Sequence, residues 1–165
     1  MSGVKTCPIE DVEEELFNHW CTEQGLTHFH VPQETYTDSW KQKTHNKALG
    51  VLEGVSDHWV KLPTIYHPKG SLLIIEFKRQ FGNTPTDSQI KFMEDMNEID
   101  NVAAVCCYGF EEAKQVVEEI KNGNFTTYDK CWERTNKIKE NRAKRAENKA
   151  KLAKKSQKSK NDLPY

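Results

Sequence analysis

Three charged side chains are spaced so that they could bind a metal ion and a phosphate together: Asp57, Glu76 and Lys78. Asp57 ends the run Gly54-Val55-Ser56-Asp57, and Glu76 and Lys78 lie two residues apart after an apolar stretch. Side chains alternate between the faces of a strand, so Glu76 and Lys78 should point the same way. If segments 56–62 and 71–79 pair antiparallel, Asp57 lies beside both of them.

Such a group of charges requires compensation. Two carboxylates about 4 Å apart repel by about 4 kcal/mol at an effective dielectric constant of about 20. One carboxyl group can take up a proton, Lys78 can neutralise the pair, or a divalent cation can bind between the carboxylates. Two carboxylates, the main-chain carbonyl of Phe77 and water are hard oxygen ligands, which suit Mg²⁺ or Mn²⁺ and suit zinc poorly. A metal bound there polarises a phosphate, and Lys78 can orient the attacking water, so the pattern indicates phosphodiester hydrolysis.

The elements that must position these residues follow from periodicity and turn signals. The apolar run 102–108 is typical of a strand buried on both faces, and Thr86 and Gln89 have the spacing of a helix capping box. The order predicts an α/β fold with a mixed sheet flanked by helices, α-β-β-β-α-β-α. The expected helices are 8–25, 86–97 and 111–121, with a short helix around 40–49, and the expected strands are 27–31, 56–62, 71–79 and 102–108. The apolar side of the first helix should contain Ile9, Val12, Leu16, Phe17, Trp20 and Cys21.

The net charge of −1 over 165 residues conceals an uneven distribution. Residues 129–165 contain 13 Lys and Arg against 5 Asp and Glu, a net charge of +8, whereas residues 1–128 carry −9. We therefore predict a folded domain over 8–124 and a basic tail over 129–165 that is helical or disordered. Basic side chains release counterions from nucleic acids, so the tail is expected to hold phosphates without sequence preference. The residues expected to do so include Arg134, Lys137, Arg142, Lys144 and Arg145.

These motifs resemble the Asp…Glu-x-Lys core of the PD-(D/E)xK nucleases, and more narrowly the VRR-NUC family. The matching segments are Gly54-Val55-Ser56-Asp57, Glu76-Phe77-Lys78, and the glycine and glutamine-led helix at Gly82 and Thr86-Asp87-Ser88-Gln89. His30-Val31-Pro32-Gln33 and Lys47-Ala48-Leu49-Gly50-Val51 also resemble family segments. The similarity extends over about residues 8–122 and leaves out the tail.

The resemblance implies a restriction-endonuclease-like fold and a metal-dependent nuclease, in a family with several members that act on branched or flapped DNA. It implies that Asp57 and Glu76 bind Mg²⁺ or Mn²⁺, that Lys78 is the catalytic lysine and that Gln89 supports the site. A glutamate of the first helix also belongs to the site, either Glu10 or Glu14, with Glu14 favoured. The sequence departs from the family pattern at Ser56, where proline is usual, and at Gln33, where asparagine is usual.

Each of these residues also has a structural explanation. Glu76 and Lys78 can be an exposed ion pair on a sheet, Gln89 can serve the capping box alone, and Glu10 and Glu14 can be a solvated helix face. His28 and His30 have no evident third ligand. Two further functions stay open: a non-catalytic nucleic-acid-binding module with the same fold, and a metal-independent domain whose tail binds an acidic protein.

Other features bear on the setting of the protein. The N-terminal residues lack the apolar block of a secretory signal, and no apolar run is long enough for a membrane span, so we expect an intracellular protein with no membrane association, in the cytoplasm or with the nucleoid or nucleus, with a viral origin left open. The five cysteines form no Cys-x-x-Cys pair and do not predict a disulfide framework or a zinc site. DNA is the expected partner, and the small size leaves room for a homodimer.

Overall fold

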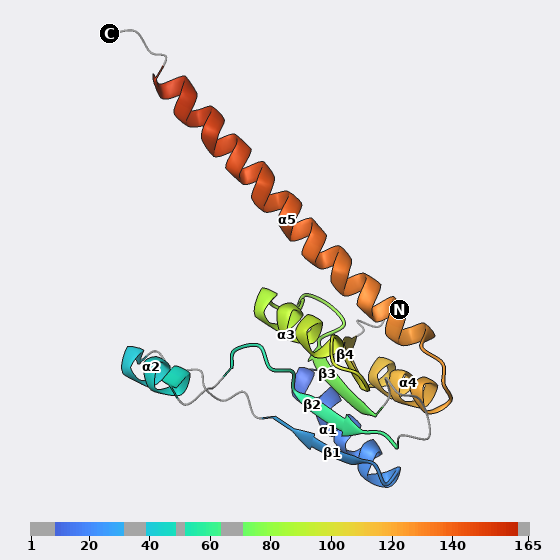
Figure 1. Cartoon of the computed structure of the whole chain (residues 1–165). Coiled ribbons are helices and arrows are strands. Elements are labelled where there is room, and N and C mark those ends of the chain that lie inside the picture. The colour runs from blue at the N-terminus through green and yellow to red at the C-terminus, as the bar shows by residue number, and fades with distance from the viewer. Residues whose placement is uncertain (1–8, 32–38, 49–51, 64–70, 162–165) are drawn as a thin grey trace, which may run out of the picture.

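The computed structural model describes residues 9–31, 39–48, 52–63 and 71–161. The described strands form one sheet in the order β1-β2-β3-β4 (Figure 1). β1 pairs with β2, and β2 with β3, in antiparallel fashion, whereas β3 and β4 are parallel. The elements in chain order are α1 (Glu10–Glu23), β1 (Thr27–His30), α2 (Trp40–Ala48), β2 (His58–Lys61), β3 (Leu72–Lys78), α3 (Asp87–Asn97), β4 (Val102–Tyr108), α4 (Phe110–Lys121) and α5 (Thr126–Asn161).

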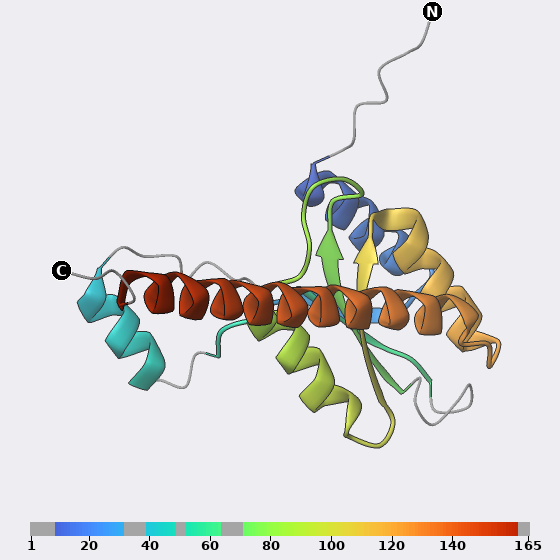
Figure 2. The same ribbon diagram turned by 90° about the horizontal axis from the view of Figure 1, so that it is seen from above.

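The parallel strands β3 and β4 lie between α1 and α4 on one side and α3 on the other (Figure 2). Along β3 the side chains of Leu73, Ile75 and Phe77 enter one core, whereas Ile74 enters the other. The alternation predicted for this strand is therefore confirmed. It places Glu76 opposite Cys106 of β4 in the register of the sheet.

Two hydrophobic cores lie on the two faces of the sheet. The first core joins α1 and α4 to one face, and the second joins α3 to the other face. The predicted mixed α/β fold with flanking helices is thus confirmed. The first core includes Phe17, Trp20, Val60, Val105, Val116 and Ile120, and the second includes Ile90, Phe92, Met93, Val102 and Ala104.

The helix boundaries predicted from the sequence are close to the observed ones, but the predicted core side of α1 is only partly right. Ile9, Val12 and Leu16 are 51%, 41% and 48% exposed. The buried side begins instead with Glu13 and continues at Phe17. The first turn of α1 meets the N-terminus of α4, where a carboxylate is needed, and for this reason a charged residue replaces an apolar one there.

The basic segment forms a single helix, α5, that begins within the folded domain. Cys131 and Thr135 are buried, and Trp132 and Ile138 pack against the second core. The predicted start of the tail, residue 129, therefore lies inside α5, and the first turns of this helix contribute to the hydrophobic packing. The distal part projects away from the domain in Figure 1.

Some predicted features lie outside the described residues: Pro32 and Gln33 of one motif, residues 49–51 of another, Cys7, and residues 162–165 of the tail. The remaining cysteines, Cys21, Cys106, Cys107 and Cys131, are free and buried. Among the helices that the structure describes, none has the length and apolar character needed to cross a membrane.

Candidate active site

Asp57 lies immediately before β2 and is turned toward β3. Its Oδ2 accepts a hydrogen bond of 3.2 Å from the main-chain N–H of Phe77, and the residue is 9% exposed. Burial raises the pKa of Asp57, the nearby charge of Glu14 raises it further, and Lys78 opposes the shift. The carboxylate is thus fixed in place in surroundings that penalise its negative charge.

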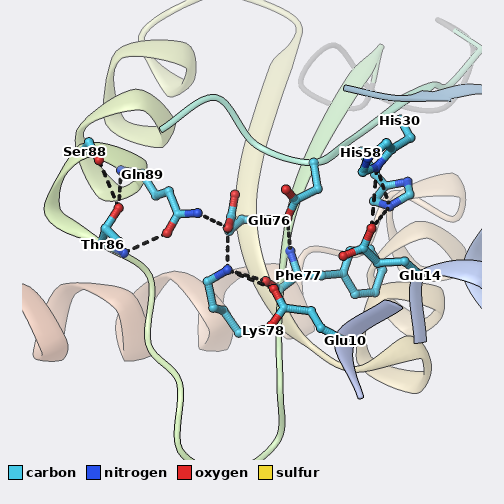
Figure 3. A network of polar contacts seen from close by, with 11 residues as sticks. Glu10, Glu14, His30, His58, Glu76, Phe77, Lys78, Thr86, Ser88 and Gln89 are labelled. Carbon is cyan, nitrogen blue, oxygen red and sulfur yellow. Dashed lines mark hydrogen bonds and ion pairs between the residues drawn. The ribbon is translucent and has the colours of Figure 1, made fainter. Parts of the chain in front are cut away.

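Glu76 is completely buried near the end of β3. Its Oε1 accepts hydrogen bonds from Lys78 Nζ, at 2.6 Å, and from the side-chain amide of Gln89 (Figure 3). Its Oε2 is also buried and has no hydrogen-bond partner among the described residues. Burial first, and then the charge of Asp57, raise the pKa of Glu76 to about 8. Asp57 also accepts a hydrogen bond from the main chain of Phe77, the residue after Glu76, so the structure brings the two carboxyl groups near each other, as strand pairing predicts.

Lys78 is the cation at the centre of the site. Its Nζ donates to Glu76 Oε1, to the carbonyl of Phe77 at 2.7 Å and to Glu10 Oε1 at 3.1 Å. Burial would lower the pKa of Lys78, but Glu76 and Glu10 raise it above its ordinary value. Lys78 is therefore an ammonium group at neutral pH and acts as a hydrogen-bond donor.

Gln89 connects the site to the start of α3. Its side-chain oxygen accepts from Thr86 N at 2.8 Å, and its main-chain N–H donates to Thr86 Oγ1 at 3.2 Å. The predicted capping box is confirmed. The other end of the same side chain reaches Glu76, so the capping explanation and the site explanation are compatible.

The backbone at Gly54 shows why the motif before Asp57 begins with glycine. Its φ is +86°, and a Cβ atom there would lie 2.5 Å from the main-chain carbon of Ser88 and 2.7 Å from the nitrogen of Gln89. A side chain would push away the helix start that presents Gln89. Ser56, at the position where the family pattern has proline, is fully buried.

The glutamates of α1 divide between two tasks. Glu10 contacts Lys78, and Glu14 Oε2 contacts His58 Nε2 at 2.9 Å. Carboxylate oxygens of Glu10, Glu14 and Asp57 all lie within 4.8 Å of one another. Glu13 instead accepts from the main-chain N–H of Phe110 at 2.7 Å, which ties α1 to α4. The structure therefore brings both candidate glutamates, Glu10 and Glu14, to the site.

The sequence pattern does not indicate His58 as a site residue, and it gives His30 no evident partner. The sheet places these two residues opposite each other in β1 and β2, and both contact Glu14. Pairing the predicted strands 27–31 and 56–62 with each other would have provided the missing signal.

The donor set fits a hard divalent cation. Lys78 contacts the carboxylates of Glu10 and Glu76, and oxygens of Glu10, Glu14 and Asp57 lie within 4.8 Å of one another. A buried oxygen of Glu76 has no hydrogen-bond partner within the part of the chain that the structure describes. Uncompensated carboxylates at low exposure favour a cation with oxygen ligands. The structure brings these carboxylates to the end of β3, beside the carbonyl of Phe77, which accepts a hydrogen bond from Lys78.

The tail residues named from the sequence fall into two groups. Arg134 makes two hydrogen bonds with the carboxylate of Glu112, at 2.9 and 2.7 Å, and Arg142 contacts Asp87 at 2.7 Å. These two arginines fasten α5 to the domain. The side chains of Lys137, Lys144 and Arg145 are exposed to solvent, and Lys137 lies 4.0 Å from Glu133 on the same helix.

Comparisons with known proteins support the fold. A solved structure described as a VRR_NUC domain protein matches with a TM-score of 0.57 and 20% sequence identity, over 72% of this chain and 93% of that one. No known family profile and no curated protein sequence gives a significant match. The chain therefore has the fold of a VRR-NUC domain, as the motifs predicted.

Proposed function

We propose that the chain is a metal-dependent endonuclease that hydrolyses phosphodiester bonds in DNA, selective for branched, flapped or junction substrates. The observation that carries the proposal is the convergence of Asp57, Glu76 and Lys78 at one end of β3, where burial and neighbouring carboxylates raise the pKa values of Asp57 and Glu76. The fold shared with a VRR_NUC domain protein is consistent with it. An intracellular location belongs to the same proposal, because DNA is the substrate.

Asp57, Glu76 and the carbonyl of Phe77 would hold Mg²⁺ or Mn²⁺. When bound, the ion would neutralise phosphate charge and lower the pKa of an attached water molecule. The protein's own groups are already ordered for this task. The N–H of Phe77 fixes Asp57, and the amide of Gln89 fixes Glu76, so little rearrangement is needed on binding.

Lys78 would stabilise the reacting phosphate. Its side chain is 11% exposed, so the ammonium group lies at the boundary between the buried carboxylates and solvent. As a charged donor it can hydrogen-bond a phosphate oxygen or hold the attacking water, and its charge opposes the negative charge that develops. Glu10 would position Lys78, which it contacts, and Glu14 would line the same side of the site near Asp57.

The distal part of α5 would bind the DNA backbone. The domain is acidic, and electrostatic repulsion would hinder its approach to DNA. The exposed basic side chains of α5 offset this repulsion by releasing counterions from phosphates. Exposed examples are Lys144, Arg145, Lys149, Lys151 and Lys154.

The experiment is incubation with labelled single strands, duplexes, flaps and four-way junctions, with Mn²⁺, Mg²⁺ or EDTA. We expect cleavage that requires the metal and that is lost in Asp57→Asn. Asp95→Asn is the matched control because this carboxylate of α3 is 58% exposed and pairs only with Lys91 among the described residues. If neither metal supports cleavage of any substrate, or if Asp57→Asn cuts as well as Asp95→Asn, the proposal fails.

Cleavage of both strands of a junction would require two copies of the chain. The exposed apolar residues Ile9, Val12 and Leu16 recur along one side of α1 and provide a surface on which a second copy could pack. Sedimentation equilibrium tests this part of the proposal: a monomer at micromolar concentration, with and without junction DNA, would contradict it.

A further inference from the structure

Two imidazole rings face the carboxylate of Glu14 at short distances. His58 Nε2 lies 2.9 Å from Glu14 Oε2, His30 Nδ1 lies 3.5 Å from the same oxygen, and the two ring nitrogens are 3.3 Å apart. Figure 3 shows both rings gathered at this carboxylate. One ligand atom from each of α1, β1 and β2 therefore converges on a single point.

Packing fixes the ring of His58. The side chain is fully buried, and Phe17 and Phe77 contact it edge to face, with ring centroids 5.8 and 5.1 Å away. Its Nδ1 makes no hydrogen bond with any residue in the described ranges. Aromatic packing rather than a hydrogen bond at Nδ1 thus directs Nε2 toward Glu14.

Protons alone satisfy this cluster poorly. A neutral imidazole has one N–H and one lone pair. If His30 and His58 both turn an N–H toward Glu14, the two N–H groups face each other. If His58 Nε2 alone turns an N–H inward, that N–H is shared between Glu14 Oε2 and the lone pair of His30 Nδ1, and this lone pair still faces the carboxylate at 3.5 Å. A cation that accepts all three lone pairs removes both conflicts.

The spacing of the three atoms matches a tetrahedral metal site. Ligands about 2.05 Å from a tetrahedral zinc ion are about 3.3 Å from one another. The observed separations of 2.9, 3.3 and 3.5 Å are distributed around that value. The side chain of His30 is 42% exposed, which leaves a solvent-facing side for a fourth ligand such as water.

We propose that Glu14, His30 and His58 bind one first-row transition-metal dication of the zinc class. Two imidazole nitrogens and one carboxylate favour such an ion over Mg²⁺, which prefers oxygen ligands. The site is distinct from the oxygen ligands Asp57 and Glu76, although Glu14 also lies near Asp57. The proposal does not depend on nuclease activity because it concerns binding of the metal alone.

The test is a titration of the full chain with Co²⁺, whose visible absorption intensifies in tetrahedral coordination, in a large excess of Mg²⁺ that fills the oxygen site. We expect one equivalent of Co²⁺, displaced by Zn²⁺. His30→Ala should weaken binding by more than about tenfold, since even changes to outer partners of a metal ligand cost that much. The matched control is His28→Ala, which removes a histidine two residues away on the same strand whose ring contacts the carbonyl of Leu26.

Three results would overturn the proposal: unchanged Co²⁺ binding in His30→Ala, an equal loss in His28→Ala, or loss of binding in Asp57→Asn, which would place the ion at the oxygen site. Asp57→Asn also separates this proposal from the nuclease proposal. It should abolish cleavage and retain Co²⁺ binding. His30 is well exposed, so His30→Ala should fold, and circular dichroism verifies this.

Discussion

At the end of β3, four carboxylates and one ammonium group are partly or fully buried, whereas the basic side chains of α5 from Lys144 to Lys154 are exposed to solvent. The four carboxylates belong to Glu10, Glu14, Asp57 and Glu76. In the buried group each charge changes the pKa of its neighbours. On the helix, salt screens the basic side chains from one another. Together they produce a positive potential that attracts a polyanion. In the proposed nuclease, the domain would supply the chemistry and the helix would supply the attraction for DNA.

The largest expected effect separates these two roles. Lys78→Ala should reduce cleavage by at least about a hundredfold, because the donor to the reacting phosphate is removed, while DNA affinity changes little. Because the pKa of Glu76 is already raised to about 8, this carboxyl group can stay protonated when Lys78 is gone, so the fold should survive. Single-turnover cleavage and fluorescence anisotropy measure the two quantities. The control is Lys91→Ala, which removes an exposed lysine of α3. Equal cleavage by both variants would contradict a catalytic role of Lys78.

The buried site should also make stability depend on pH. In the metal-free protein the pKa of Glu76 is raised from 4.5 to about 8, so the folded state binds a proton that the unfolded state has released. Stability is then highest below about pH 4.5 on account of this group, and it falls as the pH rises toward 8. Each unit of pKa shift corresponds to about 1.4 kcal/mol, so the decline should amount to a few kcal/mol.

Urea unfolding in EDTA between pH 5 and pH 8.5 measures this decline. Glu76→Gln keeps the shape of the side chain and removes the titration, so its stability should vary less with pH over the same interval. Glu94→Gln on the surface of α3 should follow the parent protein. If the free energy of unfolding depends on pH in the same way for the parent and Glu76→Gln, Glu76 does not take up a proton on folding, because Lys78 neutralises its charge.

Truncation within α5 should distinguish its two parts. Ending the chain after Arg142 removes the projecting segment and leaves the packed turns intact. DNA affinity should fall by about tenfold or more, and the salt dependence should flatten by about one unit of slope for each phosphate that the shortened helix can no longer reach. Metal-dependent cleavage at saturating protein should persist. Affinity that is unchanged across a salt titration would exclude the helix as the DNA-binding element.

Ending the chain before residue 129 should have another result. That truncation removes Cys131, Trp132 and Ile138 from the two cores, together with the ion pair between Arg134 and Glu112. We expect this shorter chain to unfold at lower temperature or to aggregate. Equal melting temperatures of the two truncated chains would contradict the packing of α5.

The smallest effects are expected for substitutions of two arginines of the same helix, Arg134 and Arg145. Arg134→Ala should lower the free energy of unfolding by about 1–2 kcal/mol, since it removes a bidentate ion pair and a cation–π interaction at 4.1 Å from the ring centroid of Tyr108. It should leave the salt dependence of DNA binding unchanged. Arg145→Ala should change stability by less than about 0.5 kcal/mol and reduce the salt slope by up to about one unit. Chemical unfolding and salt titrations of both variants measure these values. A larger loss of stability in Arg145→Ala, or a smaller salt slope in Arg134→Ala, would contradict these assignments.

Local sequence signals predicted much of the fold. The alternation in β3, the apolar run of β4 and the capping box at Thr86 each depend on residues close together in the chain, so their outcome follows from local geometry. The same alternation placed Glu76 and Lys78 on one face, and antiparallel pairing placed Asp57 beside them. The charge difference between the domain and its C-terminal segment also needed no structure.

Only the tertiary structure decided which distant groups meet. His58 joins His30 and Glu14 because β1 pairs with β2 and α1 crosses that side of the sheet. Glu13 turns to the start of α4, and Arg134 turns to Glu112, although both look like solvated charges in the sequence. The physical reason is that segments far along the chain determine which partner a charged side chain meets and how deeply it is buried. Local periodicity does not contain that information.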